Sequence, residues 1–89
     1  MKKLVLMKYL NSRGLPCYSR ITEDEAPGSD EARLDMMELE AEEMLFTGEM
    51  KEKLWIKCLD KNQYKQLMDE EAQARIDTIN KIIKLWEKL

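Results

Sequence analysis

If the stretch LMDEEAQARIDTINKIIKLWEKL forms a helix, most of its charged residues lie on the polar side, but Glu71 and Arg75 fall among the apolar residues. Their spacing suggests a specific contact. Glu71 precedes Arg75 by four residues, the order in which an acid and a base stabilise a helix as an ion pair. Arginine is seldom buried without a partner, and an unpaired buried charge costs several kcal/mol. We therefore expect that the pair satisfies itself, meets a carboxylate between residues 31 and 42, or binds an anion from outside.

A ladder of carboxylates is the second candidate site. The spacing i, i+4, i+7 and i+11 on a helix places four acids in one row, where like charges repel slightly: Glu31, Asp35, Glu38 and Glu42. The row is either a solvated face or a surface for a basic partner. A rigid acidic helix could fill the nucleic-acid groove of another protein, as small acidic phage inhibitors do. The chain resembles these inhibitors in style only, through its size, charge and self-contained helices, and no motif ties it to a named family.

The sequence lacks the patterns of catalytic and metal sites. It contains no histidine, which excludes His-based triads and His zinc sites. Cys17 and Cys58 form no CxxC motif, and three scattered glycines form no phosphate-binding loop. The paired acids lack the Glu-x-x-His motifs of di-metal bundles. We expect no enzyme activity, no catalytic residue, no metal and no cofactor.

Charge is distributed unevenly along the 89 residues. Residues 1–21 carry a net charge of +5, residues 22–50 carry −10, and residues 51–89 carry +2. An acidic middle between basic flanks suggests attraction within or between chains, or an acidic binding surface. The net charge of −3 argues against non-specific DNA binding. Weak nucleic-acid binding through the basic N-terminal segment is kept as a further alternative.

The apolar segments are too short to enter a membrane. No run approaches the roughly 18 apolar residues that a membrane-spanning helix needs. The opening MKKLVLMKYLNSRG has a short apolar run, broken by Lys8, and no small-residue cleavage site. We therefore do not interpret it as a signal peptide. We expect a cytoplasmic protein with reduced cysteines and no membrane partner.

The first 29 residues contain an ambiguous segment followed by a loop. The run KLVLMKYL fits either a helix or a strand. Gly14 and Pro16 lie where a helix over residues 2–12 would end, with Leu10 and Leu15 in a Schellman contact, and we favour this helix. The rival is a β-hairpin with NSRG as its turn and CYSRI as its return strand. Residues 16–29, with both prolines and a cluster of acids, predict an irregular loop.

Two helices are predicted with more definite boundaries. Ser29 is a suitable N-cap for a helix over residues 30–46. Its apolar residues fall in one core-facing arc: Leu34, Met37, Ala41, Met44 and Leu45. Asp60 and Gln63 fit a capping box that begins a last helix over residues 61–88. Between them, residues 50–59 fit a helix or a strand, and we favour the helix.

These segments predict an all-α fold, a single helical domain over residues 1–89. It would contain three to four helices, the last of them long and amphipathic. The alternative is an α+β fold with a short sheet made from residues 3–9 and 53–59.

The last helix is the strongest indication of function. It would be about 40 Å long, with apolar residues around half its circumference, more than one neighbouring helix covers. We therefore expect a non-enzymatic, homo-oligomeric adaptor or inhibitor that presents the acidic row to a basic partner. The expected interface is Leu67, Glu71, Arg75, Ile79, Ile82, Ile83 and Trp86, with the charged pair setting its register. The alternative is a binder of phosphate or nucleotide in which Arg75 acts with Lys8 or Tyr9.

Overall fold

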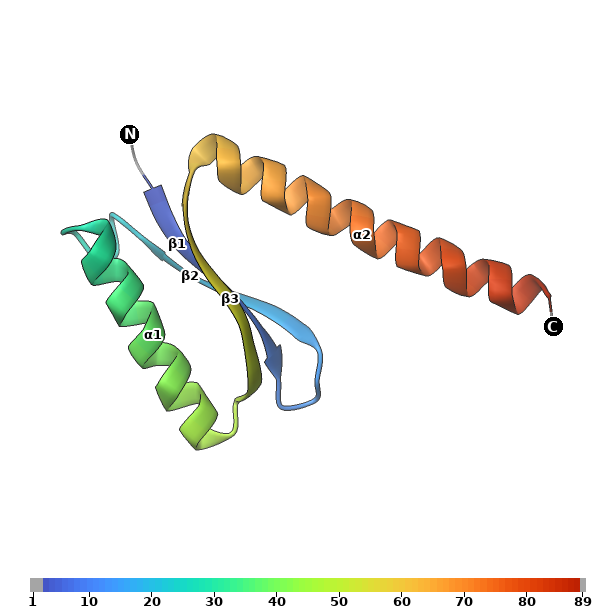
Figure 1. Ribbon diagram of the computed structural model, residues 1–89, viewed down its shortest axis with the longest axis horizontal. Helices are drawn as coiled ribbons and strands as arrows, with labels where there is room; N and C mark the ends of the chain where they lie inside the picture. The colour runs from blue at the N-terminus through green and yellow to red at the C-terminus, as the bar shows by residue number, and fades with distance from the viewer. Residues whose placement is uncertain (1–2, 89) are drawn as a thin grey trace.

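The protein is a three-stranded antiparallel sheet with one helix on each face. The computed structural model describes residues 3–88. The strands are β1 (Lys3–Asn11), β2 (Pro16–Thr22) and β3 (Met50–Asp60), and their order in the sheet is β2-β1-β3. Helix α1 (Asp30–Thr47) connects β2 to β3, and helix α2 (Lys61–Glu87) follows β3 (Figure 1). The chain therefore has an α+β fold, and the all-α prediction was wrong.

The segment predicted to be the first helix is a strand. Its side chains are buried on alternate faces of the sheet and do not follow helical spacing. Val5 and Met7 are buried on the face that α1 covers, whereas Leu4, Leu6 and Lys8 alternate with them on the other face. A β-hairpin, the rival interpretation, connects β1 to β2. Gly14 has the left-handed φ of 76° expected at a helix end, but uses it in the hairpin turn.

The side chain of Asn11 closes this turn. Its carboxamide oxygen accepts hydrogen bonds from the backbone N–H groups of Arg13 and Leu15 at 2.9 and 3.0 Å. Asparagine competes with regular structure by making such local bonds, which is why it favours turns. The irregular loop predicted over residues 16–29 is consequently too long, since residues 16–22 form β2 and only residues 23–29 connect it to α1.

The segment predicted to be a helix over residues 50–59 is also a strand. β3 pairs with β1 so that Val5 lies opposite Cys58 and Lys8 lies opposite Trp55, with irregularities of register beyond Lys8. This pairing agrees with the alternative sheet from residues 3–9 and 53–59. A ten-residue run has no period strong enough to distinguish the two structures, and the distant partner strand decides between them.

Helix α1 buries the core against one face of the sheet. Ser29 caps it as predicted, and its hydroxyl accepts a hydrogen bond from Ala32 N–H at 3.1 Å. Met37 and Ala41 are buried, Leu34 and Met44 pack against the core, and Leu45 is exposed. The helix ends at Gly48, whose φ of 84° is the left-handed conformation that favours glycine.

Helix α2 leaves the sheet after its first three turns. The capping box of Asp60 and Gln63 is present as predicted. Tyr64, Leu67, Met68 and Glu71 are half-buried, but every described residue after them in α2 is exposed. The radius of gyration is 15.9 Å, whereas a compact chain of this length would have about 12 Å. The second half of α2 therefore projects beyond the rest of the molecule (Figure 1).

Candidate functional site

An open cleft lies where α2 separates from the sheet. It has a volume of about 410 Å³, and it is lined by Lys8, Pro16, Tyr18, Glu71, Ala74, Arg75, Thr78 and Ile79. Strands β1 and β2 supply its base, because Lys8 and Tyr18 are neighbours in the hairpin register and point to the face opposite α1. The cleft thus brings together Glu71, Arg75 and Lys8, three of the residues that the sequence singled out.

Glu71 fastens α2 to the sheet. One of its carboxylate oxygens accepts hydrogen bonds from Lys8 Nζ at 2.6 Å and from the Tyr18 hydroxyl at 2.7 Å. The bond to Lys8 is the main reason that the pKa of Glu71 lies below its ordinary value, although burial acts against it. The same bond raises the pKa of Lys8. Burial, followed by the bond to Glu71, raises the pKa of the Tyr18 hydroxyl.

Arg75 does not form the predicted ion pair with Glu71. Its side chain is exposed, and among residues 3–88 it forms no hydrogen bond or ion pair. Glu71 bonds across to the sheet instead, so the two charges interact only at longer range, where Arg75 helps to lower the Glu71 pKa. Of the three expected arrangements, the self-satisfied pair is not the one observed.

Tyr18 occupies the position that the anion-binding hypothesis gave to Tyr9. Tyr9 lies one residue after Lys8 in β1 and therefore points to the opposite face, where it packs against the core under α1. Tyr18 instead lies beside Lys8, with Lys8 Nζ 5.8 Å from the centre of its ring. Knowledge of the hairpin register would have identified it, since Lys8 and Tyr18 are directly paired.

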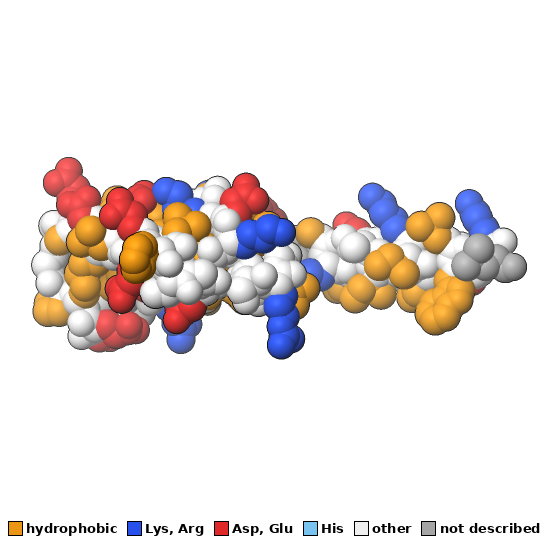
Figure 2. Space-filling model, turned by 90° about the horizontal axis from the view of Figure 1, so that it is seen from below, with side chains coloured by type: hydrophobic (Ala, Val, Ile, Leu, Met, Phe, Trp, Pro, Cys, Tyr) orange, Lys and Arg blue, Asp and Glu red, His pale blue; other side chains and the backbone are white. Residues whose placement is uncertain are grey.

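The second half of α2 carries a stripe of large apolar side chains without cover. Ile76, Ile79, Ile82, Ile83 and Trp86 are between 46 and 74% exposed. Leu67, the remaining apolar residue of the predicted interface, is half-buried against the sheet. Figure 2 shows hydrophobic and basic side chains together on this projecting part of the molecule.

The four acids predicted to form a row are exposed on α1: Glu31, Asp35, Glu38 and Glu42. Glu38 forms an ion pair with Lys53 of β3 at 3.0 Å. The outward face of α1 also exposes Met36, Leu39 and Phe46, the last of these 93% exposed. Acidic and hydrophobic side chains accordingly alternate on the end of the molecule that contains α1 (Figure 2).

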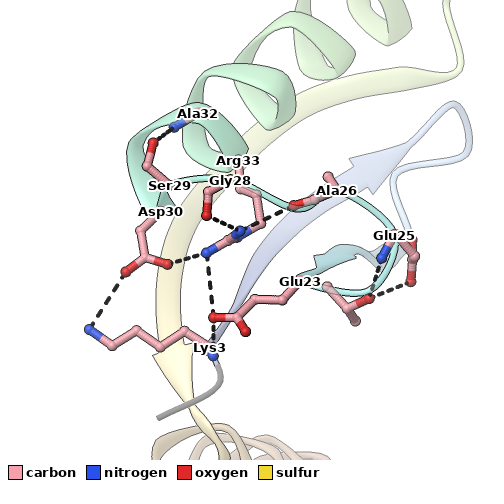
Figure 3. A network of polar contacts seen from close by, with 10 residues as sticks. Lys3, Glu23, Glu25, Ala26, Gly28, Ser29, Asp30, Ala32 and Arg33 are labelled. Carbon is pink, nitrogen blue, oxygen red and sulfur yellow. Dashed lines mark hydrogen bonds and ion pairs between the residues drawn. The ribbon is translucent and has the colours of Figure 1, made fainter.

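Arg33 is a structural residue that the sequence did not reveal. Only 2% of it is exposed, and its guanidinium donates to the carbonyls of Ala26 and Gly28 at 3.1 and 3.0 Å. It also pairs with Asp30 and lies 3.6 Å from Glu23 (Figure 3). The sequence signal that could have identified it is its position as the single base among the eleven acids of residues 22–50. Its contacts fasten residues 23–29 to the start of α1.

The remaining chemistry-bearing groups do not form a site. Cys17 and Cys58 are free thiols, and burial is the main cause that raises the pKa of Cys58, which disfavours the reactive thiolate. Residues 3–88 contain no cluster of acids and cysteines arranged to hold a metal. Neither helix in this part of the chain is long and apolar enough to cross a membrane.

The basic residues of the first strand are engaged within the molecule. Lys8 bonds to Glu71, and Lys3 lies 3.8 Å from Asp30. Each contact reduces the positive charge that β1 offers to a nucleic acid. No protein-family model, curated protein or solved structure matches the chain.

Proposed function

We propose that the chain is a non-enzymatic protein–protein interaction module that assembles with further copies of itself through the second half of α2. The observation that carries this proposal is the uncovered apolar stripe on a helix that extends past its own domain. Contiguous apolar patches at the surface of a monomer commonly mark binding sites. An isolated helix gains little stability from its own hydrogen bonds, so a projecting helix benefits from a packing partner.

The size of the stripe is sufficient for an association. Full burial of a large apolar side chain contributes about 1.5–3 kcal/mol. The five residues Ile76, Ile79, Ile82, Ile83 and Trp86 are about half exposed or more, so completing their burial contributes roughly half of that each. This gain is of the same order as the lower estimates for the cost of association, about 4–15 kcal/mol. We therefore expect a reversible assembly that depends on concentration.

The oligomeric state tests the proposal. Size-exclusion chromatography with light scattering should give a mass above that of one chain at micromolar concentration, decreasing on dilution. Ile79→Asp should shift the equilibrium to the monomer by placing a charge in the stripe. Asn80→Asp adds the same side chain at the next position, on the polar face, and should leave assembly unchanged. A wild-type protein that is monomeric throughout this range would refute the proposal.

An adaptor or inhibitor role for the acidic helix α1 is the accompanying part of this proposal. The exposed carboxylates of its acidic row support a basic partner. The alternative, an anion site in the cleft, is supported by the position of Arg75 and Lys8 on its lining. Glu71 opposes it, because this carboxylate already neutralises Lys8. Thermal stabilisation by inorganic phosphate that Arg75→Ala abolishes would favour the alternative.

A further inference from the structure

Two exposed helix faces carry the same pattern of residues. On α1 the outward positions follow each other at intervals of four, three, four and three: Ala32, Met36, Leu39, Glu43 and Phe46. On α2 the corresponding intervals are three, four, three and four: Ala72, Arg75, Ile79, Ile82 and Trp86. All ten residues are exposed. These intervals are those of the seam along which two helices pack in a coiled coil.

Each seam contains one charged residue, and the two charges have opposite sign. Glu43 interrupts the apolar series of α1, and Arg75 interrupts that of α2. Neither side chain forms a hydrogen bond or ion pair with another residue between positions 3 and 88. A charge within an apolar seam favours the one register that gives it a partner.

Antiparallel alignment of the two seams pairs their opposite charges and also brings their apolar residues together. When Glu43 is placed opposite Arg75, Leu39 meets Ile79 and Met36 meets Ile82. The outer layers then combine a large with a small side chain, since Phe46 meets Ala72 and Trp86 meets Ala32. The five layers extend along about 21 Å of helix. The reversed, parallel alignment would instead bring Phe46 opposite Ile79 and leave Leu39 opposite Ala72.

We propose that the second half of α2 in one copy packs antiparallel on the outer face of α1 in a second copy, with Glu43 and Arg75 paired across the contact. The inference rests on the proposed self-assembly and identifies the surface that α2 would bind. The contact is intermolecular because, within one chain, α1 and the base of α2 lie on opposite faces of the sheet (Figure 1).

Overall charge favours this pairing over the two symmetric ones. Helix α1 contains seven acids and one arginine, the buried Arg33, whereas residues 75–88 contain four bases and two acids. A contact between two α1 helices would bring two strongly acidic surfaces together. A contact between two α2 helices would leave each Arg75 without an acid in the seam. Opposite net charges therefore select a contact between α1 and α2.

Such a contact is heterologous, because each copy uses two different surfaces. Repetition of a heterologous contact gives a closed ring or an open chain of copies, rather than a symmetric dimer. This property permits a test by complementation, in which each of two variants retains only one of the surfaces. Leu39→Asp would inactivate the α1 surface, and Ile82→Asp would inactivate the α2 surface.

Light scattering of the two variants, separately and mixed, distinguishes the arrangements. Each variant alone should be monomeric, and an equimolar mixture should give a 1:1 complex. If Leu39→Asp assembles as the wild type does, the α1 surface is not used, and the inference fails while self-assembly stands. If the mixture stays monomeric, the inference also fails. If the wild type is itself monomeric, the proposed function fails first. Both substituted positions are exposed, so the variants should fold as the wild type does. Circular dichroism of each variant checks this.

A charge exchange tests the proposed register. Glu43→Arg and Arg75→Glu should each weaken assembly at least tenfold, because each brings two like charges together in the seam. The double variant should recover most of the wild-type affinity, since the pair is restored with its charges exchanged. Glu42→Arg makes the same substitution one position outside the seam and serves as the control. Failure of the double variant to recover, or an equal effect of Glu42→Arg, would overturn the register.

Discussion

The attachment of α2 to the sheet depends on the Glu71 carboxylate, which gives a quantitative prediction. Replacing Glu71 by glutamine retains the side-chain size and one acceptor oxygen but removes the negative charge. Lys8 Nζ lies 2.6 Å from the carboxylate, and about a fifth of each side chain is exposed. At this distance and an effective dielectric constant of about 20, the gross attraction is about 6 kcal/mol. Loss of solvation on partial burial offsets most of it.

Measured ion pairs bracket the net effect. Exposed pairs contribute about 0.2–1 kcal/mol, whereas removing one partner of a fully buried pair costs about 3–5 kcal/mol. Because the Glu71–Lys8 pair is mostly but not fully buried, we expect Glu71→Gln to lower the free energy of unfolding by about 2 kcal/mol. For a chain of this length, that corresponds to a Tm decrease of about 8–16 °C.

Urea denaturation of a double-mutant cycle measures the interaction itself. The cycle consists of the wild type, Glu71→Gln, Lys8→Met and the double variant, followed by far-UV circular dichroism. Glu70→Gln is the matched control, because Glu70 is the exposed neighbour of Glu71. A coupling free energy below about 0.5 kcal/mol, within the range expected for independent sites, would refute the anchoring role.

The pH dependence of stability provides an independent check on the same pair. The pKa of Glu71 is lowered in the folded protein, so its contribution is complete above its unfolded pKa of about 4.3. That contribution is lost as the pH falls through the lower, folded pKa. The pKa of Lys8 is raised, so its contribution is complete below about pH 10.4 and is lost as the pH rises through the folded pKa. Glu71→Gln should remove this share of the acid sensitivity.

Two further predictions concern the supports of α1. Arg33→Met should lower the free energy of unfolding by about 2–4 kcal/mol, because it removes charged donors from two backbone carbonyls. In urea denaturation, the control Arg13→Met in the exposed hairpin turn should have a much smaller effect. Equal effects of the two substitutions would contradict the role of Arg33. Gly48→Ala should cost about 1–2 kcal/mol through its positive φ alone, since an added Cβ would meet no atom within 4 Å. An unchanged Tm of Gly48→Ala in thermal denaturation would contradict this prediction.

Local chemistry predicted the helices, but it did not predict the strands. The caps at Ser29 and Asp60 depend on residues within three positions of each other, and both are present. By contrast, residues 3–11 and 50–60 acquire their conformation from one another across about 50 positions. Their apolar runs are too short for periodicity to separate a strand from a helix. From the sequence, the sheet is therefore only the alternative to an all-α fold.

Residue type singles out three side chains that line the cleft, but it does not indicate the contacts that each of them makes. Lys8, Glu71 and Arg75 do meet at one cleft, because charged residues within apolar runs require partners or solvent. Which partner each one finds depends on the strand register and on the angle of α2. Tyr18 takes the place expected for Tyr9, since strand alternation turns Tyr9 to the other face. Neither the register nor the angle is readable from a single sequence.

The central position of β1 has a consequence for the order of folding. Its pairing with β2 joins residues such as Met7 and Ser19, 12 positions apart, whereas its pairing with β3 joins Val5 to Cys58, 53 positions apart. The larger loop adds about 1 kcal/mol of closure entropy. The hairpin can thus form early during synthesis, and one edge of β1 stays unpaired until residue 60 has been made. Helix α1 can cover the apolar face of the hairpin in this interval, but the unpaired N–H and C=O groups along that edge of β1 stay open to other chains.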